Sequence, residues 1–364
     1  MLARTVLVTA VENFVLFGTC LALAMFPVAL IVRQITIREI WRVKAESLAQ
    51  FYAVAIIVPP IASAWLVTAA LLPRLWLTPE AFAAEHSAPL HQLHLLGELT
   101  LSVEPALAYA MALFLLVIAA VVAWSNLRGS WRVSKVIKQL DMHAVAPPME
   151  QVLLVKEVAG KAGLSVGLVM SDYPLCFVWG FRHSKLILSS GLLGTLSSIE
   201  LTGVLEHEAA HHVRRDNLIK LLLSLCSYSS LAFPLSRLIV SWRATEVEMI
   251  CDEVAAVRIS DPLEIAEALV KLRRQTMKRQ IASASIPTNA IASSFVSDSS
   301  LTFQRRVDRL LTLDAPVSSS SGSPSNFCWT GAVILAVSMV TLSVILIAPL
   351  SIHHAAETLI GIFK

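Results

Sequence analysis

Long apolar runs constrain this chain more than any other feature. Of its 364 residues, 56% are hydrophobic and only 15% are charged, a balance too apolar for an ordinary soluble protein. A run of about 20 apolar residues is long enough to cross a bilayer as one helix. The sequence predicts four such transmembrane helices, at residues 14–32, 51–72, 105–124 and 329–350.

Basic residues set the predicted orientation of these helices. Several follow the first run and several more follow the third, whereas the second loop, residues 73–104, contains only Arg74. The positive-inside rule then puts the N-terminus outside and the segment after Trp124 in the cytoplasm. The sequence therefore predicts a protein that crosses the cytoplasmic (inner) membrane several times.

An H-E-x-x-H motif predicts a metal site. His207 and His211 are four residues apart, so on a helix they lie on one face and can direct two imidazole nitrogens at one ion. Glu208 projects beside that pair, where it can take a proton from a metal-bound water. This is the zinc-peptidase arrangement of two histidine ligands and a glutamate base. The alternative is a chance match on an exposed helix.

The helix that carries this motif is predicted to begin at a capping box of Ser197 and Glu200. It is predicted to continue to about Ala232, to turn near Pro234 and to return as a second helix. This helical hairpin brings Glu248 back to the two histidines. A true membrane span between the motifs would put the two halves of the zinc site on opposite sides of the bilayer.

A second motif supplies the predicted third ligand. Glu248 and Asp252 are again four residues apart on a predicted helix. Glu248 can complete the site, because catalytic zinc usually takes three protein ligands and keeps a fourth position for water. Asp252 can accept a hydrogen bond from the ring N–H of a ligand histidine. The alternative is a solvated helix face, which we predict for Glu246 and Glu253.

The two motifs, H-E-A-A-H-H-V-R-R-D-N and E-M-I-C-D, resemble the BlaR/MecR-type membrane metallopeptidases, the antibiotic-sensing transducers of the gluzincin group. The resemblance includes C-F-V-W-G and K-L-I-L-S upstream and spans roughly residues 125–313. It implies that His207, His211 and Glu248 are zinc ligands and that Glu208 is the general base.

Residues 151–190 predict a small α/β unit. Its predicted elements are a helix at 149–162 and strands at 166–170, 175–178 and 186–188. In zinc peptidases of this group an edge strand beside the active helix pairs with extended substrate. By resemblance, Phe177, Val178, Trp179 and Gly180 are the candidate for that strand; the alternative is an ordinary core strand.

The segment after the last predicted span departs from the resemblance. Penicillin-sensing members carry a large sensor there, whereas residues 351–364 contain no S-x-x-K or K-T-G pattern. Direct β-lactam sensing is therefore not expected, and the input is predicted to be loop 73–104, a partner protein or the membrane. His91 and His94 of that loop form H-x-x-H, an alternative metal site, although such histidines are more often solvated.

The sequence predicts a mainly α membrane protein, with four transmembrane helices and a small α+β gluzincin zinc-peptidase domain inserted between the third and fourth spans. The predicted parts are a membrane domain at 1–125, a cytosolic zinc metallopeptidase domain at 126–317, a flexible linker at 318–328, the fourth helix at 329–350 and a short tail at 351–364.

The predicted function is zinc-dependent endopeptidase activity in transmembrane signalling, by cleavage of a cytosolic regulator or of the chain itself. The expected partners are a protein or peptide substrate, such as a transcriptional repressor, and the lipid bilayer. A net charge of only +3 does not suggest direct nucleic-acid binding. Two alternatives are a housekeeping membrane protease of the HtpX or CAAX prenyl protease type and a non-catalytic signalling scaffold.

Overall fold

The structure, a computed structural model, describes most of the chain. The described residues are 2–37, 44–77, 92–95, 99–102, single positions between 110 and 124, 149–171, 174–180, 184–282 and 300–313. The described positions of the third predicted span are helical. The predicted linker, fourth span and tail lie outside the described residues, so the number of spans stays a prediction.

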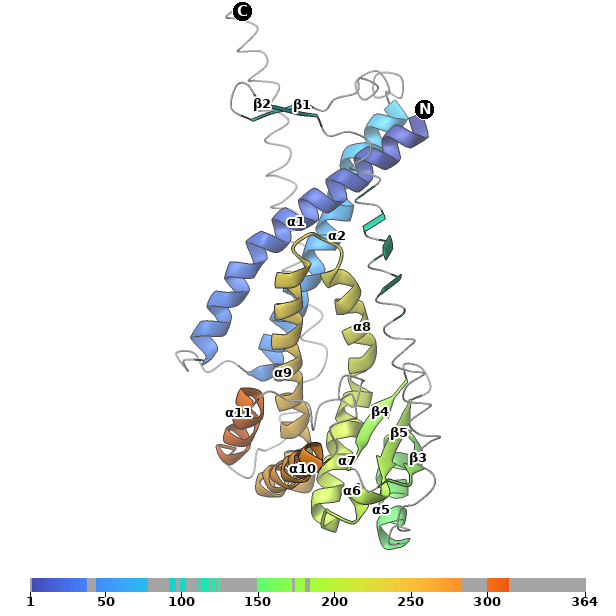
Figure 1. Cartoon of the computed structure of the whole chain (residues 1–364), viewed down its shortest axis with the longest axis vertical. Coiled ribbons are helices and arrows are strands. Elements are labelled where there is room, and N and C mark those ends of the chain that lie inside the picture. Colours follow the sequence, from blue (N-terminus) through green and yellow to red (C-terminus); the bar gives the residue numbers. More distant parts are fainter. Residues whose placement is uncertain are drawn as a thin grey trace, which may run out of the picture.

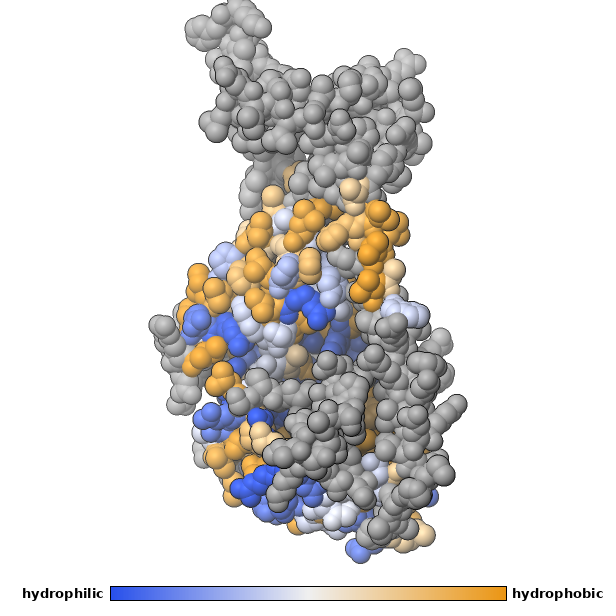
Figure 2. All heavy atoms as spheres, viewed as in Figure 1, coloured by the Kyte–Doolittle hydropathy of each residue, from blue (hydrophilic) through white to orange (hydrophobic). Residues whose placement is uncertain are grey.

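Two long helices, α1 (Leu2–Ile37) and α2 (Ala45–Leu77), pack against each other (Figure 1). Their segments Phe17–Ile37 and Ala45–Trp65 are long and apolar enough to cross a membrane, and they cover much of the first two predicted spans. Apolar atoms gather on the surface of this part of the molecule (Figure 2). The exposed apolar side chains of these segments include Leu23, Val28, Leu30, Ile31, Ile61 and Trp65.

The predicted continuous helix to Ala232 is wrong. The helix α7 (Ser198–Val213) ends before Arg215, and a separate helix, α8 (Asp216–Ser227), follows. Arg215 has a φ of 55°, in the left-handed region that is incompatible with a continuing α-helix. The helix that follows α8 has Pro234 in its first turn, where proline removes no helical hydrogen bond.

The predicted helical hairpin is present, formed by α8 and α9 (Phe233–Ile259). Its tip reaches α1, because the Leu231 N–H donates to Thr19 Oγ1 at 3.0 Å. Nearer the zinc motif, Trp242 of α9 lies in one buried apolar cluster with Tyr52 of α2. The hairpin therefore runs alongside the two candidate spans (Figure 1).

The predicted α/β unit is confirmed to within one residue at each boundary. It comprises α5 (Met149–Lys161), β3 (Ser165–Val169), β4 (Cys176–Trp179) and β5 (Lys185–Ser189), followed by the short helix α6 (Ser190–Leu193). The strand order is β3-β5-β4. The central strand β5 is parallel to β3 and antiparallel to β4, so β4 lies at one edge of the sheet.

The helix α7 is the centre of the peptidase-like part. Its capping box is confirmed: Ser197 Oγ accepts the Glu200 N–H at 3.2 Å, and Glu200 Oε2 accepts the Ser197 N–H at 2.8 Å. It packs against α5, β4, α9 and α10 (Pro262–Ala282), and α11 (Ser300–Leu311) packs on α9 and α10. These elements share one buried core, which includes Leu188, Leu201, Leu205, Ile265, Leu269 and Leu310.

Gly203 allows α10 to approach α7 closely. A Cβ at this position would lie 2.2 Å from Cδ1 of Ile265, which is itself buried. We therefore expect Gly203→Val to destabilise the fold by about 1–3 kcal/mol, measured as a lower thermal unfolding temperature. The control is Gly160→Val in α5, where a Cβ meets nothing within 4 Å. Equal losses at the two positions would contradict the close-contact explanation.

A short hairpin occupies part of the predicted loop 73–104. The strand β1 (Gln92–Leu95) pairs antiparallel with β2 (Leu99–Ser102) within this predicted connection between the second and third spans. His94 lies in β1, whereas His91 lies outside the described residues. The alternative metal site at these two histidines therefore stays a prediction.

Candidate metal centre

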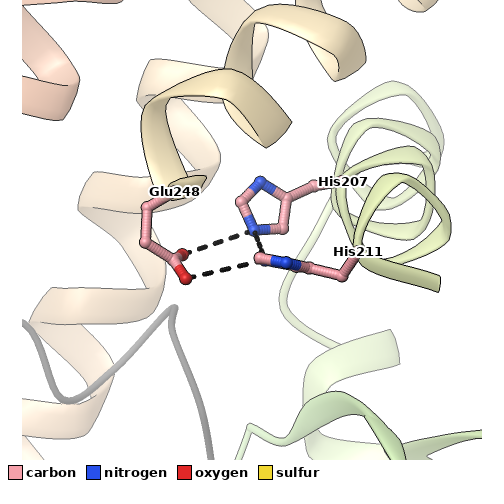
Figure 3. A group of neighbouring side chains, drawn as sticks. All are labelled: His207, His211 and Glu248. Carbon is pink, nitrogen blue, oxygen red and sulfur yellow. Dashed lines mark hydrogen bonds and ion pairs between the residues drawn. The ribbon is translucent and has the colours of Figure 1, made fainter. Parts of the chain in front are cut away.

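The structure brings the two histidines of the H-E-x-x-H motif together on one face of α7 (Figure 3). His207 is fully buried and His211 is partly buried. Their Nε2 atoms lie 3.1 Å apart. The one-turn spacing therefore places two imidazole nitrogens at a common point, as the helical periodicity predicts.

Glu248 lies on α9 and faces the two histidines of α7 (Figure 3). Its Oε2 lies 3.6 Å from His207 Nε2, and its Oε1 lies 3.6 Å from His211 Nε2. The hairpin is what positions this side chain, because α9 returns past α7 after the turn at residues 228–232.

The three donor groups have the dimensions of a zinc site. Zinc–nitrogen bonds of about 2.0–2.1 Å in a tetrahedral site require donor atoms about 3.3 Å apart, and the separations here are 3.1, 3.6 and 3.6 Å. Among the described residues, Glu248 Oε2 is buried without a hydrogen-bond partner. His207, His211 and Glu248 therefore fit a zinc ion.

Two aspartates orient the histidine rings. Asp252 Oδ1 lies 2.9 Å from His207 Nδ1, and Asp216 Oδ2 lies 2.9 Å from His211 Nδ1. A ring whose Nδ1–H faces a carboxylate presents the lone pair of Nε2 to the metal position. Asp252 lies where the sequence analysis placed a hydrogen-bond acceptor. Asp216 was missed, because the left-handed turn at Arg215 that brings it back to His211 is not marked by proline or glycine in the sequence.

Arg306 of α11 closes the buried side of the site and was not predicted. Its Nε and Nη2 donate to Asp252 at 2.7 and 2.8 Å, and its Nη1 lies 3.4 Å from Glu248 Oε2. The residue is only 1% exposed. Burial by itself would raise the pKa of Asp252, but Arg306 and His207 together lower it. Burial would also raise the pKa of Glu248, but His207, His211 and, to a smaller extent, Arg306 lower it.

Removing this cation should destabilise the fold strongly. We expect Arg306→Ala to cost about 3–5 kcal/mol, because it leaves buried carboxylates uncompensated. The matched control is Arg309→Ala on the same helix, whose exposed ion pair with Glu253 is worth about 0–1 kcal/mol. Thermal unfolding of both variants provides the measurement. Similar losses for the two arginines would refute a special role for Arg306.

Glu208 is not one of the three donor groups, and one oxygen of its carboxylate contacts the sheet. Its Oε2 accepts the N–H of Val178 in β4 at 3.2 Å. Its Oε1 is buried and has no hydrogen-bond partner among the described residues. Burial raises the pKa of Glu208, an effect that the nearby histidines His211 and His207 partly oppose. One oxygen is thus anchored, and the other is free to handle a proton.

The predicted substrate strand lies beside Glu208. Phe177 and Val178 are buried within β4, while Trp179 is partly buried, and β4 is an edge strand. Asn217 Nδ2 donates to the carbonyls of Val178 and Gly180 at 3.1 and 3.2 Å. A cavity of ≈ 820 Å³ opens here, lined among others by Val178, Glu208, His211, Asn217 and Glu248. Substrate binding by this strand stays a prediction.

A second group of possible ligands overlaps the first. His211, Asp216 and Cys251 also lie close together, and Cys251 Sγ is 3.4 Å from His211 Nδ1. Burial raises the pKa of Cys251. Asp216 already engages Nδ1 of His211, so the first group is the better zinc site.

The expectation of a solvated face for Glu246 is wrong. Glu246 is only 2% exposed and lies 3.5 Å from Arg305 Nη2. Glu253 is partly exposed and pairs with Arg309 at 2.7 Å. The helix α11 packs on α9 and brings Arg305 to Glu246, a contact between segments far apart in sequence.

Comparisons with known proteins match this part of the chain. Residues 149–282 match the model of peptidase family M48. Protease HtpX of Legionella pneumophila is 39% identical over 71 residues, 18% of this chain and 25% of the relative. The protease HtpX homolog of Thermococcus kodakarensis is 31% identical over 122 residues, 32% of this chain and 40% of the relative.

A third relative, the protease HtpX homolog of Ralstonia nicotianae, is 40% identical over 74 residues, 19% of this chain and 26% of the relative. The chain thus spans between a quarter and two fifths of the length of these curated relatives. The matches support the M48 peptidase family with HtpX-like relatives, and they do not single out the BlaR/MecR type.

Proposed function

We propose that this chain is a membrane-bound zinc endopeptidase that hydrolyses peptide bonds in protein substrates. One observation carries the proposal: three donor groups at zinc spacing lie beside a buried carboxylate that is hydrogen-bonded to an edge strand. The family match over residues 149–282 supports the same activity.

In the proposed reaction, three residues would bind the metal and Glu208 would transfer the proton. His207, His211 and Glu248 would hold a zinc ion, which would supply Lewis-acid chemistry by lowering the pKa of water and polarising a carbonyl. Glu208 Oε1 accepts the proton of the attacking water and returns it to the leaving amine nitrogen. Its Oε2 stays on the Val178 N–H, which holds the carboxylate in place.

Chelation should abolish cleavage. We expect 1,10-phenanthroline to stop hydrolysis of an unfolded, fluorescently labelled protein by the purified full chain, and added zinc to restore it. The control is 1,7-phenanthroline, which has the same ring system but cannot chelate. Cleavage that survives zinc removal, with zinc loss verified by elemental analysis, would contradict a zinc peptidase.

The proposed active site faces the cytoplasm, just below the bilayer. The hairpin supports this placement, because its two helices run to the level of Thr19 and back, so the zinc residues on α7 and α9 stay on one side. The charge asymmetry of the loops gives the direction. We expect cysteines introduced at positions 91 and 135 to react with a membrane-impermeant reagent from outside and inside, respectively. Labelling of both from outside intact cells would refute this topology.

Two biological roles fit this activity. The matches to protease HtpX favour a housekeeping membrane protease, and the resemblance to BlaR/MecR-type peptidases favours cleavage of a cytosolic regulator such as a repressor. Substrates trapped in cells by an inactive variant distinguish them. Membrane proteins would indicate the HtpX-like role, and a soluble regulator would indicate signalling.

A further inference from the structure

The outer edge of β4 is already occupied by side chains of the chain itself. Leu175 O accepts the N–H of Ser189 in the neighbouring strand. In an antiparallel pair, only every second residue bonds to the partner strand. In the observed register, Val178 and Gly180 are therefore residues whose backbone groups point outward, away from β5. Asn217 Nδ2 donates to both of these outward carbonyls, at 3.1 and 3.2 Å.

These two carbonyls are the acceptors that an added strand needs. An extended peptide that pairs with an edge strand offers N–H groups two residues apart, and Val178 O and Gly180 O have that spacing. The single amide of Asn217 therefore makes the same contacts as two backbone N–H groups of such a peptide. A peptide cannot pair with these two carbonyls while Asn217 is hydrogen-bonded to them.

The position of Asn217 also allows its side chain to be displaced from the two carbonyls. It is the second residue of α8, directly after Asp216, whose carboxylate contacts His211. The Asn217 side chain is exposed and borders the cavity beside the zinc residues. A rotation about its side-chain torsions can move the amide into solvent without moving α8 or the Asp216 contact.

We propose that Asn217 is a positioning residue that caps the substrate strand at rest and is displaced by the backbone of an extended peptide. This inference rests on the proposed peptidase function and deepens it. The preferred substrate is a segment that can adopt extended structure with free backbone N–H groups. Folded segments and segments blocked by proline or N-methylation at the pairing positions cannot replace the amide.

Peptide affinity tests the proposal. We measure binding of a fluorescent extended peptide to the zinc-loaded full chain in a Glu208→Gln background, which prevents turnover. Asn217→Ala should tighten the Kd by about two- to tenfold, the net value of about one hydrogen bond. Asn217→Gln retains an amide and should restore a Kd near that of the parent. The same peptide with N-methylated backbone should bind weakly and respond to neither substitution.

The same change should appear in turnover. With Glu208 intact, Asn217→Ala should lower KM by the same factor and leave kcat within about twofold. An unchanged or weakened Kd for Asn217→Ala, in a variant that still cleaves and binds zinc, would overturn the capping proposal and leave the peptidase function standing. Absence of both peptide binding and wild-type cleavage would instead count against the peptidase function.

Discussion

Glu208→Gln should yield a folded, zinc-loaded protein whose cleavage rate is about a hundred to ten thousand times lower than that of the wild type. Glutamine keeps the size of the side chain and can still accept the Val178 N–H that Glu208 Oε2 accepts at 3.2 Å. It cannot take the proton of the attacking water. Because Glu208 is not one of the three donor groups, zinc content should not change.

This loss is measured with a labelled unfolded protein in detergent solution and as chain fragments in cells. The matched control is Glu206→Gln on the same helix, whose carboxylate pairs with Arg258 and takes no part in the proposed reaction. Zinc should be bound in all three proteins. Identical fragments and rates for wild type and Glu208→Gln would remove the protease function and favour the non-catalytic scaffold.

Glu248→Ala should lose the metal and, with it, all detectable cleavage. Two histidines alone leave zinc with too few protein ligands for a catalytic site. We expect a fall in zinc affinity larger than the roughly 10- to 100-fold that accompanies loss of an outer hydrogen-bond partner. The substitution also removes the carboxylate that Nη1 of Arg306 approaches at 3.4 Å.

Elemental analysis of the purified protein measures this effect. Wild type should hold about one zinc per chain, and His211→Ala should resemble Glu248→Ala. The control is Glu253→Ala on the same helix, because Glu253 pairs with Arg309 at the surface. Full zinc in Glu248→Ala would exclude Glu248 from the ligand set.

The parts of the site that depend on local periodicity could be predicted from the sequence. His207 and His211 meet because four residues make about one helical turn, and the capping box of Ser197 and Glu200 marks the start of that helix. The strands around Val178 follow from their β-branched and apolar residues between turn signals. Each of these features is decided by residues within a few positions of one another.

Contacts between distant segments could not be predicted in the same way. Arg306 lies on a helix that reads as basic and amphipathic, and only the packing of α11 on α9 carries its guanidinium to Asp252. The same packing buries Glu246, which reads as a solvated acid. A charge pattern cannot distinguish a solvated cation from one that is paired inside the core.

The helix break at Arg215 shows a different limit. No proline or glycine marks it, so the apolar periodicity indicated one helix as far as Ala232. The left-handed residue is stabilised by tertiary contacts: Asp216 meets His211 and Asn217 meets the β4 carbonyls. These contacts connect the metal site with the edge of β4. No sequence pattern predicts either contact.

Zinc K-edge X-ray absorption of the purified full chain tests the metal site most directly. A site made of His207, His211 and Glu248 gives only nitrogen and oxygen neighbours, at about 2.0–2.1 Å, with the imidazole scattering of two histidines. The competing group contains Cys251 and would give a sulfur neighbour at about 2.3 Å. A nitrogen and oxygen shell that is lost in Glu248→Ala is the predicted result. A sulfur neighbour, or a shell unchanged in Glu248→Ala, would contradict it.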